Sequence, residues 1–173
     1  MGSDDRPLVF VPDSFAVPRE LVTEEFRLEP LGPEHNEGDY EAWTSSIDHI
    51  RATPGFEDAS ASPGSGGGTW PDPGMTPEEN LVDLRRHAED FAHRSGFTYT
   101  VRGRGSDRII GCVYIYPLGN ADGAAKVCSW VRADQADLDA AVHDAVAAWL
   151  RSAWPFTAVS YAPRVSSSDR HRL

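Results

Sequence analysis

Residues 97–118 read FTYTVRGRGSDRIIGCVYIYPL, and this stretch decides the fold. Phe97–Arg102 alternates in polarity, which predicts a strand with one buried face. Gly103–Asp107 is a short turn, so the strand that follows it should pair antiparallel with the first. Arg108–Leu118 is almost entirely apolar, which is typical of a central strand covered on both faces. The stretch therefore predicts an antiparallel hairpin at the centre of a sheet.

The next elements extend this sheet toward the C-terminus. Ala124–Arg132 predicts a third strand, joined to the hairpin by the loop 119–123. A helix is predicted over Gln135–Arg151, and Pro155–Pro163 predicts the last strand. Strand, helix and strand in one sheet cross over right-handed, so the last two strands should be parallel. The buried side of this helix should present Leu138, Val142, Ala145, Val146 and Trp149.

The elements on the N-terminal side complete the order. Glu24–Leu31 predicts a half-buried strand, and Gly32–Pro33 should start a single helix that ends before Pro54. Thr76 and Glu79 form a capping box at the start of a helix predicted over Pro77–Ser95. The sequence thus predicts an α/β (α+β) fold, with a mainly antiparallel twisted sheet and helices on its faces. The apolar face of the first helix consists of Tyr40, Trp43, Ile47 and Ile50, and that of the second of Leu81, Leu84, Ala88 and Phe91.

The composition divides the chain into three parts. Residues 1–19 contain prolines and predict an extended arm, residues 20–162 form the domain, and residues 163–173 form a loose tail. Within the domain, residues 57–75 are rich in Gly, Pro and Ser and predict a flexible loop. Trp70 in this loop either covers the edge of the core or closes over a ligand.

The charge and the cysteines restrict the function. The formal net charge of −11 argues against binding to nucleic acid or to an anionic membrane. We expect a cytoplasmic protein, because no apolar run is long enough to span a bilayer and the N-terminus does not resemble a signal peptide. Cys112 and Cys128 lie in apolar strands, either reduced in the core or bridged between neighbouring strands. No zinc spacing occurs, so no metal is expected.

Two stretches are similar to one known family. Residues 20–43, ELVTEEFRLEPLGPEHNEGDYEAW, contain a strand of the form T-E-x-F/L-x-L-x-P-L before a helix that starts with proline. Residues 97–118 contain an I-G-x-V/C strand after a short hairpin turn. Both resemble the GNAT-type acyl-CoA N-acyltransferases, and the element order agrees from Glu20 to about Tyr161. The resemblance implies acetyl-CoA as co-substrate and a small-molecule or protein amine as acceptor.

The resemblance also implies a location for acetyl-CoA. In the family the fourth strand splits from the fifth, the pantetheine arm pairs with the fourth, and the pyrophosphate lies on a loop of the form Q/R-x-x-G-x-G/A. Here Gln135 and Ala140 match the ends of that loop, whereas Leu138 replaces its first glycine and Asp137 and Asp139 add negative charge. The alternative is that Asp134 or Asp137 caps the helix without any ligand. The implied cofactor-binding residues are Trp130, Val131, Arg132, Gln135, Ala136, Asp137, Leu138 and Ala140.

The catalytic groups are less well defined. Candidates in the central strands are Tyr114, Tyr116 and Ser129, although residues of these types in central strands are more often core residues than catalysts. His49 is expected either in a substrate cleft or on the surface, and His143 in solvent. The family's usual tyrosine acid lies in a closing helix beyond the fifth strand, and only about a dozen residues follow Tyr161. The resemblance therefore predicts a GNAT-like sheet that lacks the last helix and strands.

Two functions and one assembly follow from these observations. The chain is either an N-acyltransferase that acetylates an amine, or a non-catalytic binding or assembly module with a GNAT-like fold and a degenerate cofactor loop. The apolar strand Phe156–Ala162 would lie at an exposed sheet edge. A second copy of the chain could cover it in a homodimer, which we expect, or the arm Leu8–Val17 could fold back over it.

Overall fold

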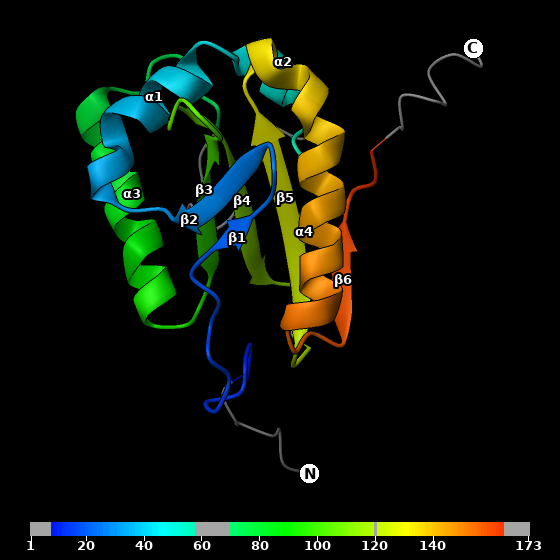
Figure 1. Cartoon of the computed structure of the whole chain (residues 1–173). Coiled ribbons are helices and arrows are strands. Elements are labelled where there is room, and N and C mark those ends of the chain that lie inside the picture. The colour runs from blue at the N-terminus through cyan, green and yellow to red at the C-terminus, as the bar shows by residue number, and fades with distance from the viewer. Residues whose placement is uncertain (1–7, 58–69, 120, 165–173) are drawn as a thin grey trace.

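A six-stranded sheet forms the centre of the molecule (Figure 1), which is a computed structural model that describes residues 8–57, 70–119 and 121–164. The strands lie in sequence order, and only the last pair, β5 and β6, is parallel. Both the antiparallel hairpin and the parallel final pair are as predicted. The strands are β1 (Leu21–Val22), β2 (Phe26–Pro30), β3 (Phe97–Gly103), β4 (Ile109–Pro117), β5 (Ala124–Val131) and β6 (Ala158–Tyr161).

Glycine at position 111 allows β4 and β5 to pair closely. Gly111 lies opposite Val131 in the register of the two strands. A Cβ atom at position 111 would lie 2.2 Å from the carbonyl oxygen of Trp130, which is main chain and cannot rotate away. The I-G pair noted in the sequence therefore has a steric reason.

Helices cover both faces of the sheet. The helical segments are η1 (Pro33–His35), α1 (Asn36–Thr44), α2 (Ile47–Arg51), α3 (Pro77–Ala92), η2 (Ala133–Leu138) and α4 (Asp139–Ala153). One apolar core joins α4 to residues such as Val113 and Val131, and the other joins α1 and α3 to residues such as Tyr114 and Trp130. Neighbouring positions along β4 and β5 thus contribute to opposite cores, because side chains alternate between the faces of a strand. No helix in the described part of the chain has both the length and the apolar character to cross a membrane.

The prediction of one continuous helix after Pro33 is wrong. A 3-10 turn, α1 and α2 replace it, and the break lies at Ser45 and Ser46. The hydroxyl of Thr44 donates to the carbonyl of Tyr40 at 2.6 Å, and that of Ser45 donates to the carbonyl of Ala42 at 3.0 Å. Hydroxyl groups that bond to the preceding turn compete with helix continuation.

The N-terminal arm packs against the end of the sheet and does not pair with β6. Phe10 is buried, with its ring centroid 5.7 Å from that of Phe97 and 5.1 Å from that of Phe156. The amide of Gly123 donates to the carbonyl of Val9 at 3.1 Å, so the arm contacts the connection between β4 and β5. In the described residues β6 therefore remains an edge strand of the sheet, with β1 at the other edge.

Trp70 belongs to a core. Its side chain is 8% exposed, and its ring lies 5.7 Å from that of Trp43 and 6.1 Å from that of Trp130. These contacts agree with the first of its two expected roles, whereas residues 58–69 of the same loop lie outside the described residues. Cys112 and Cys128 are both buried and free, so the bridged alternative is excluded.

Candidate functional site

Of the two parallel strands, β5 extends beyond the end of β6 next to the start of α4. Pairing of β5 with β6 runs from Ala124 and Ala158 to Val127 and Tyr161. Beyond that point β5 continues to Val131, where the chain turns into η2 and α4 (Figure 1). The segment Cys128–Val131 therefore extends past β6, and we call the space beside it the β5–β6 gap.

One arginine side chain fills this gap. Arg164 is only 4% exposed, although the sequence places it in the tail. Its Nη2 donates to the carbonyl oxygen of Ser129 at 2.8 Å, and its Nε donates to Oδ2 of Asp139 at 2.6 Å. Its Nη1 donates to the carbonyl of Ala162 at 2.9 Å. The guanidinium thus joins β5, the first residue of α4 and the segment after β6.

The arginine at the end of β5 is also fully engaged. Arg132 is buried and forms a bidentate ion pair with the carboxylate of Glu41 in α1. Its Nε lies 3.3 Å from Oδ1 of Asp134, whose other oxygen accepts from Arg108 at 3.0 Å. The hydrogen bonds from Arg132 lower the pKa of Glu41, which stays ionised. Arg132 is the implied cofactor-binding residue that could compensate the charge of a phosphate group, and its own charge is already neutralised by carboxylates.

The prediction that Asp134 or Asp137 caps the helix is wrong. Neither N-cap residue, Arg132 of η2 or Leu138 of α4, caps its helix with its side chain, and the first amide of η2, that of Ala133, donates instead to the hydroxyl of Ser46 at 2.9 Å. Asp134 bonds to arginines, and Asp137 is exposed. Leu138 is half-buried and packs against the α4 core, so a side chain that anchors the helix stands at the family's glycine position.

Comparisons with known proteins place this geometry among acetyltransferases. No protein-family model matches the chain, and no curated protein matches it. Its structure is similar to the ribosomal-protein-S5-alanine acetyltransferase from Vibrio fischeri, with 15% identity and a TM-score of 0.57 over 76% of this chain and 66% of that one. A GCN5-related N-acetyltransferase from Brucella melitensis gives 16% identity and a TM-score of 0.54 over 79% of this chain and 57% of that one.

A third structure is the microcin C7 self-immunity acetyltransferase MccE in complex with acetyl-CoA and AMP. It shares 14% identity and has a TM-score of 0.58 over 87% of this chain and 76% of that one. The chain has the GNAT fold. It spans less than two thirds of the Vibrio fischeri and Brucella melitensis proteins, and at these identities the likeness concerns the fold.

The GNAT fold implies an acetyl-CoA site between β5 and β6, but the residues in this gap do not fit a pantetheine arm as they stand. Ser129 contributes a main-chain acceptor there, and Arg164 already occupies it. The implied cofactor residues do lie in one region, because all of them fall between the end of β5 and the first turn of α4. Of these, Trp130 faces the opposite core, where its Nε1 donates to the hydroxyl of Tyr114 at 3.0 Å.

The three catalytic candidates are engaged in internal contacts. Tyr114 is buried in the α1–α3 core, and burial raises its pKa well above the usual value. The hydroxyl of Tyr116 donates to Asp90 at 2.7 Å, and burial raises its pKa as well. The hydroxyl of Ser129 is hydrogen-bonded to that of Tyr161 inside the β5–β6 gap. Both tyrosines stay protonated at neutral pH, and Ser129 has a phenol beside it instead of a base.

The two histidines lie in different surroundings. His49 is half-buried, and its Nε2 has no hydrogen-bond partner. The expectation that His143 faces solvent is wrong, because its side chain is only 13% exposed and its ring lies 4.3 Å from that of Tyr161. Sequence spacing placed His143 next to the buried face of the helix, and only the position of β6 brings it against a ring.

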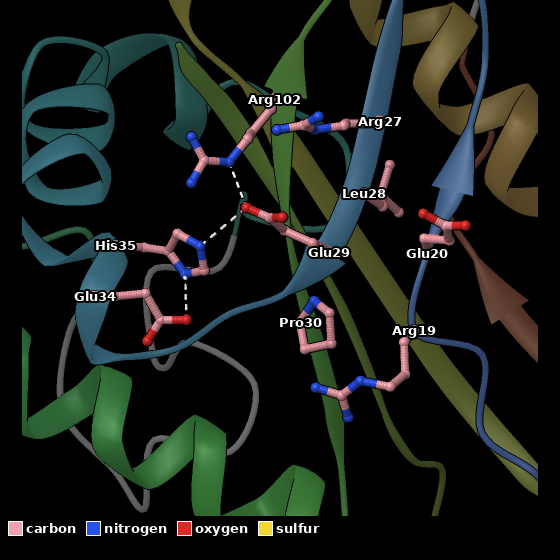
Figure 2. A pocket seen from close by; sticks show the side chains of 9 residues that line it. All are labelled: Arg19, Glu20, Arg27, Leu28, Glu29, Pro30, Glu34, His35 and Arg102. Atoms are coloured by element: carbon pink, nitrogen blue, oxygen red, sulfur yellow. Dashed lines mark hydrogen bonds and ion pairs between the residues drawn. The ribbon is translucent and has the colours of Figure 1, made fainter. Parts of the chain in front are cut away.

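A charged cavity of about 540 Å³ lies over β2, toward the edge of the sheet opposite β6 (Figure 2). At its centre the carboxylate of Glu29 accepts from Nε of Arg102 and lies 3.1 Å from Nε2 of His35. Nδ1 of His35 accepts from the amide of Gly32 at 2.9 Å, so the ring proton is on Nε2 and points to Glu29. Burial alone raises the pKa of Glu29, but the bonds from Arg102 and His35 outweigh it and lower the pKa. None of the sequence-predicted site residues lines this cavity.

Proposed function

We propose that the chain is an N-acyltransferase that moves an acetyl group from acetyl-CoA to an amine. The observation that supports this most is the part of β5 that extends beyond the end of β6 beside the start of α4, within a sheet similar to that of solved acetyltransferases. Free amide groups at the start of a helix favour anionic ligands. The unpaired end of β5 and the helix start together support a place for an extended acyl donor beside them.

The side chains at the candidate site are compatible with what this reaction requires of a catalyst. Transfer of an acyl group to a neutral amine depends strongly on the positioning of the two reactants. A weak general base, or a water molecule, supplies a smaller part of the rate. The engaged state of Tyr114, Tyr116 and Ser129 therefore does not oppose the proposal.

A second cavity offers a place for the acceptor. It measures about 450 Å³ and lies beside Glu41, which binds Arg132 at the end of β5. Its lining includes four carboxylates and two arginines. Both arginines bind acidic partners elsewhere, Arg102 at Glu29 and Arg108 at Asp134, and two of the carboxylates bind arginines outside the lining, Glu41 at Arg132 and Asp107 at Arg27. The carboxylates of Glu34 and Glu37 then leave the lining with a net negative charge. We infer that a cationic amine suits this cavity better than an acidic acceptor. The four carboxylates that line this second cavity are those of Glu34, Glu37, Glu41 and Asp107.

One alternative is favoured by a specific observation. The arginine in the β5–β6 gap and the core-anchored Leu138 both occupy positions that acetyl-CoA would need. A GNAT-fold domain with these features would serve as a non-catalytic binding or assembly module. Under this alternative the chain binds acetyl-CoA no better than it binds free adenosine nucleotides.

Two measurements decide between the proposals. Calorimetric titration with acetyl-CoA, with AMP as the control ligand, tests binding. Release of the coenzyme A thiol in the presence of a panel of primary amines, with matched carboxylic acids as controls, tests transfer. Acetyl-CoA binding together with amine-dependent thiol release supports the acyltransferase. Binding no tighter than that of AMP, without thiol release, both in the wild type and in a variant without the Arg164 guanidinium, contradicts it and leaves the module.

A further inference from the structure

Arg164 has an unusually complete set of partners for a side chain at this position. Its Nε, Nη1 and Nη2 each donate a hydrogen bond of 2.6–2.9 Å, to Asp139, Ala162 and Ser129 respectively. The side chain is 96% buried by this arrangement, since only 4% of it is exposed. A buried guanidinium is stable only when paired and hydrogen-bonded, so the three contacts act together.

The ion pair with Asp139 has a second source of stability. Asp139 is the first residue of α4, where the positive end of the helix dipole favours a negative charge. Oδ2 of Asp139 binds Arg164, while its other oxygen is buried and has no hydrogen-bond partner among the described residues. Arg164 thus supplies the counter-charge for this carboxylate, and any group that replaces the guanidinium must meet the same anion.

The contact with Ser129 blocks a main-chain position. β5 runs past the end of β6, so the carbonyl of Ser129 has no strand partner and accepts from Arg164. The hydroxyl groups of Ser129 and Tyr161 bond to each other in the same place. A ligand that adds to β5 in an extended form must displace the guanidinium from this carbonyl before it can bind.

We propose that Arg164 is a latch that closes the β5–β6 gap and keeps the acyl donor out, so that acetyl-CoA binds only when this side chain withdraws. This inference rests on the proposed acyltransferase function. The apparent affinity for a ligand falls by the fraction of molecules in the open form. Opening requires Arg164 to break its hydrogen bonds with Asp139 and with two main-chain carbonyls, so the open form is a small fraction of the molecules.

The test compares loss of the latch with loss of charge alone. Arg164→Gln opens the gap but also removes a positive charge, which by itself weakens binding of the polyanionic acetyl-CoA. Arg151→Gln is the matched control, because Arg151 is an exposed arginine near the end of α4. Calorimetric titration should give acetyl-CoA binding to Arg164→Gln that is tighter than wild type by about tenfold or more. Arg151→Gln should bind as weakly as wild type, or more weakly.

A second variant keeps the test valid if Arg164→Gln does not fold, which circular dichroism would show. Lysine retains the charge but presents its donors from a single nitrogen, so Arg164→Lys cannot hold all three acceptors and should also bind acetyl-CoA more tightly than wild type. Equal affinity in wild type and the Arg164 variants would overturn the latch and leave the acyltransferase proposal standing. An absence of binding in every variant would overturn both, because Arg164 would then not be what keeps acetyl-CoA out.

Discussion

At the scale of single residues, Gly111 decides how closely β4 and β5 approach. The carbonyl of Trp130 lies where a side chain at position 111 would begin, so Gly111→Ala must push the two strands apart. We expect this variant to lose roughly 1–3 kcal/mol of unfolding free energy, as overpacked cores do. Urea denaturation measures the loss.

Gly103, at the end of β3, provides the control for this substitution. A Cβ atom at position 103 would meet its nearest neighbour, the hydroxyl of Ser106, at an ordinary distance of 3.4 Å. Gly103→Ala should therefore unfold close to the wild-type urea midpoint. Equal losses in both variants would show that the strand pairing tolerates a side chain at position 111.

Asp39 makes stability depend on pH. It lies in α1 and is fully buried, and burial raises its pKa to about 7, although Asn80 donates a hydrogen bond to it at 3.2 Å. The unfolded carboxyl has a pKa near 3.8, so between about pH 4 and about pH 7 the folded state holds one additional proton. Stability from this residue is therefore lost as the pH rises through that window, by at most about 1.4 kcal/mol per pH unit.

Asp39→Asn removes this dependence. We expect its unfolding free energy relative to wild type to increase from about pH 4.5 to about pH 7 and to level off above that, because only the wild type must bury a charge there. Denaturation at a series of pH values measures the difference. Asp48→Asn, on the exposed side of α2, should follow the wild-type curve. Parallel curves for Asp39→Asn and wild type would contradict the raised pKa.

At the scale of the elements, the start of α3 is formed by a side-chain cap. The hydroxyl of Thr76 accepts from the amide of Glu79 at 3.1 Å, as predicted, and donates to the Glu79 carboxylate, which in a complete capping box would accept from the Thr76 amide. Thr76→Ala leaves that amide to water and should cost about 1 kcal/mol of unfolding free energy. Thr76→Ser keeps the hydroxyl and should retain most of the stability in the same urea titration. If both variants unfold alike, the cap does not stabilise α3.

Most elements could be predicted from the sequence because their signals are local. The hairpin around Gly103–Asp107, the cap at Thr76 and the parallel β5–β6 pair each follow from neighbouring residues and a topological rule. The break at Ser45 and Ser46 was missed, because apolar spacing continues across it while hydroxyl groups compete with the helix. β1 was missed because two residues, Leu21 and Val22, give no measurable alternation.

The candidate site was harder to predict because its contacts join distant parts of the chain. The sequence located the end of β5 and the start of α4, where the implied cofactor residues do lie together. It could not show that Glu41 neutralises Arg132, a partner 91 positions away. Nor could it place Arg164 against Ser129, since a tail rich in Ser and Arg has no pattern that indicates burial. Local patterns thus predicted where the candidate site would lie, but not which side chains fill it.

At the scale of the whole molecule, the sheet ends in an exposed strand. β6 is one of the two edge strands of the described sheet, opposite β1, and Val159 within it is 43% exposed. A bare strand edge pairs readily with another chain, so we expect two copies to associate through β6. Sedimentation at micromolar concentration should show a species of twice the 18.9 kDa chain mass.

A charged residue on the edge should prevent this association. Val159→Lys should sediment as a monomer, because a charge on an edge strand blocks pairing. Val82→Lys is the control, since Val82 is 64% exposed on α3, away from the sheet edge, and it should remain a dimer. A wild-type protein that sediments as a monomer would show that β6 is stable as a free edge.

The two-sided packing of the sheet also divides the tryptophans. Trp43, Trp70 and Trp130 lie together in the core under α1 and α3, with Trp70 5.7 Å and 6.1 Å from the other two rings. Trp149 and Trp154 lie 5.4 Å apart in the core under α4. Indoles this close couple their electronic transitions, so each layer has its own near-ultraviolet circular dichroism signal. Replacing Trp70 or Trp154 with phenylalanine would remove one indole and its coupling from one layer at a time. Near-ultraviolet spectra recorded during thermal unfolding would then report whether the two layers of the molecule unfold together or in sequence.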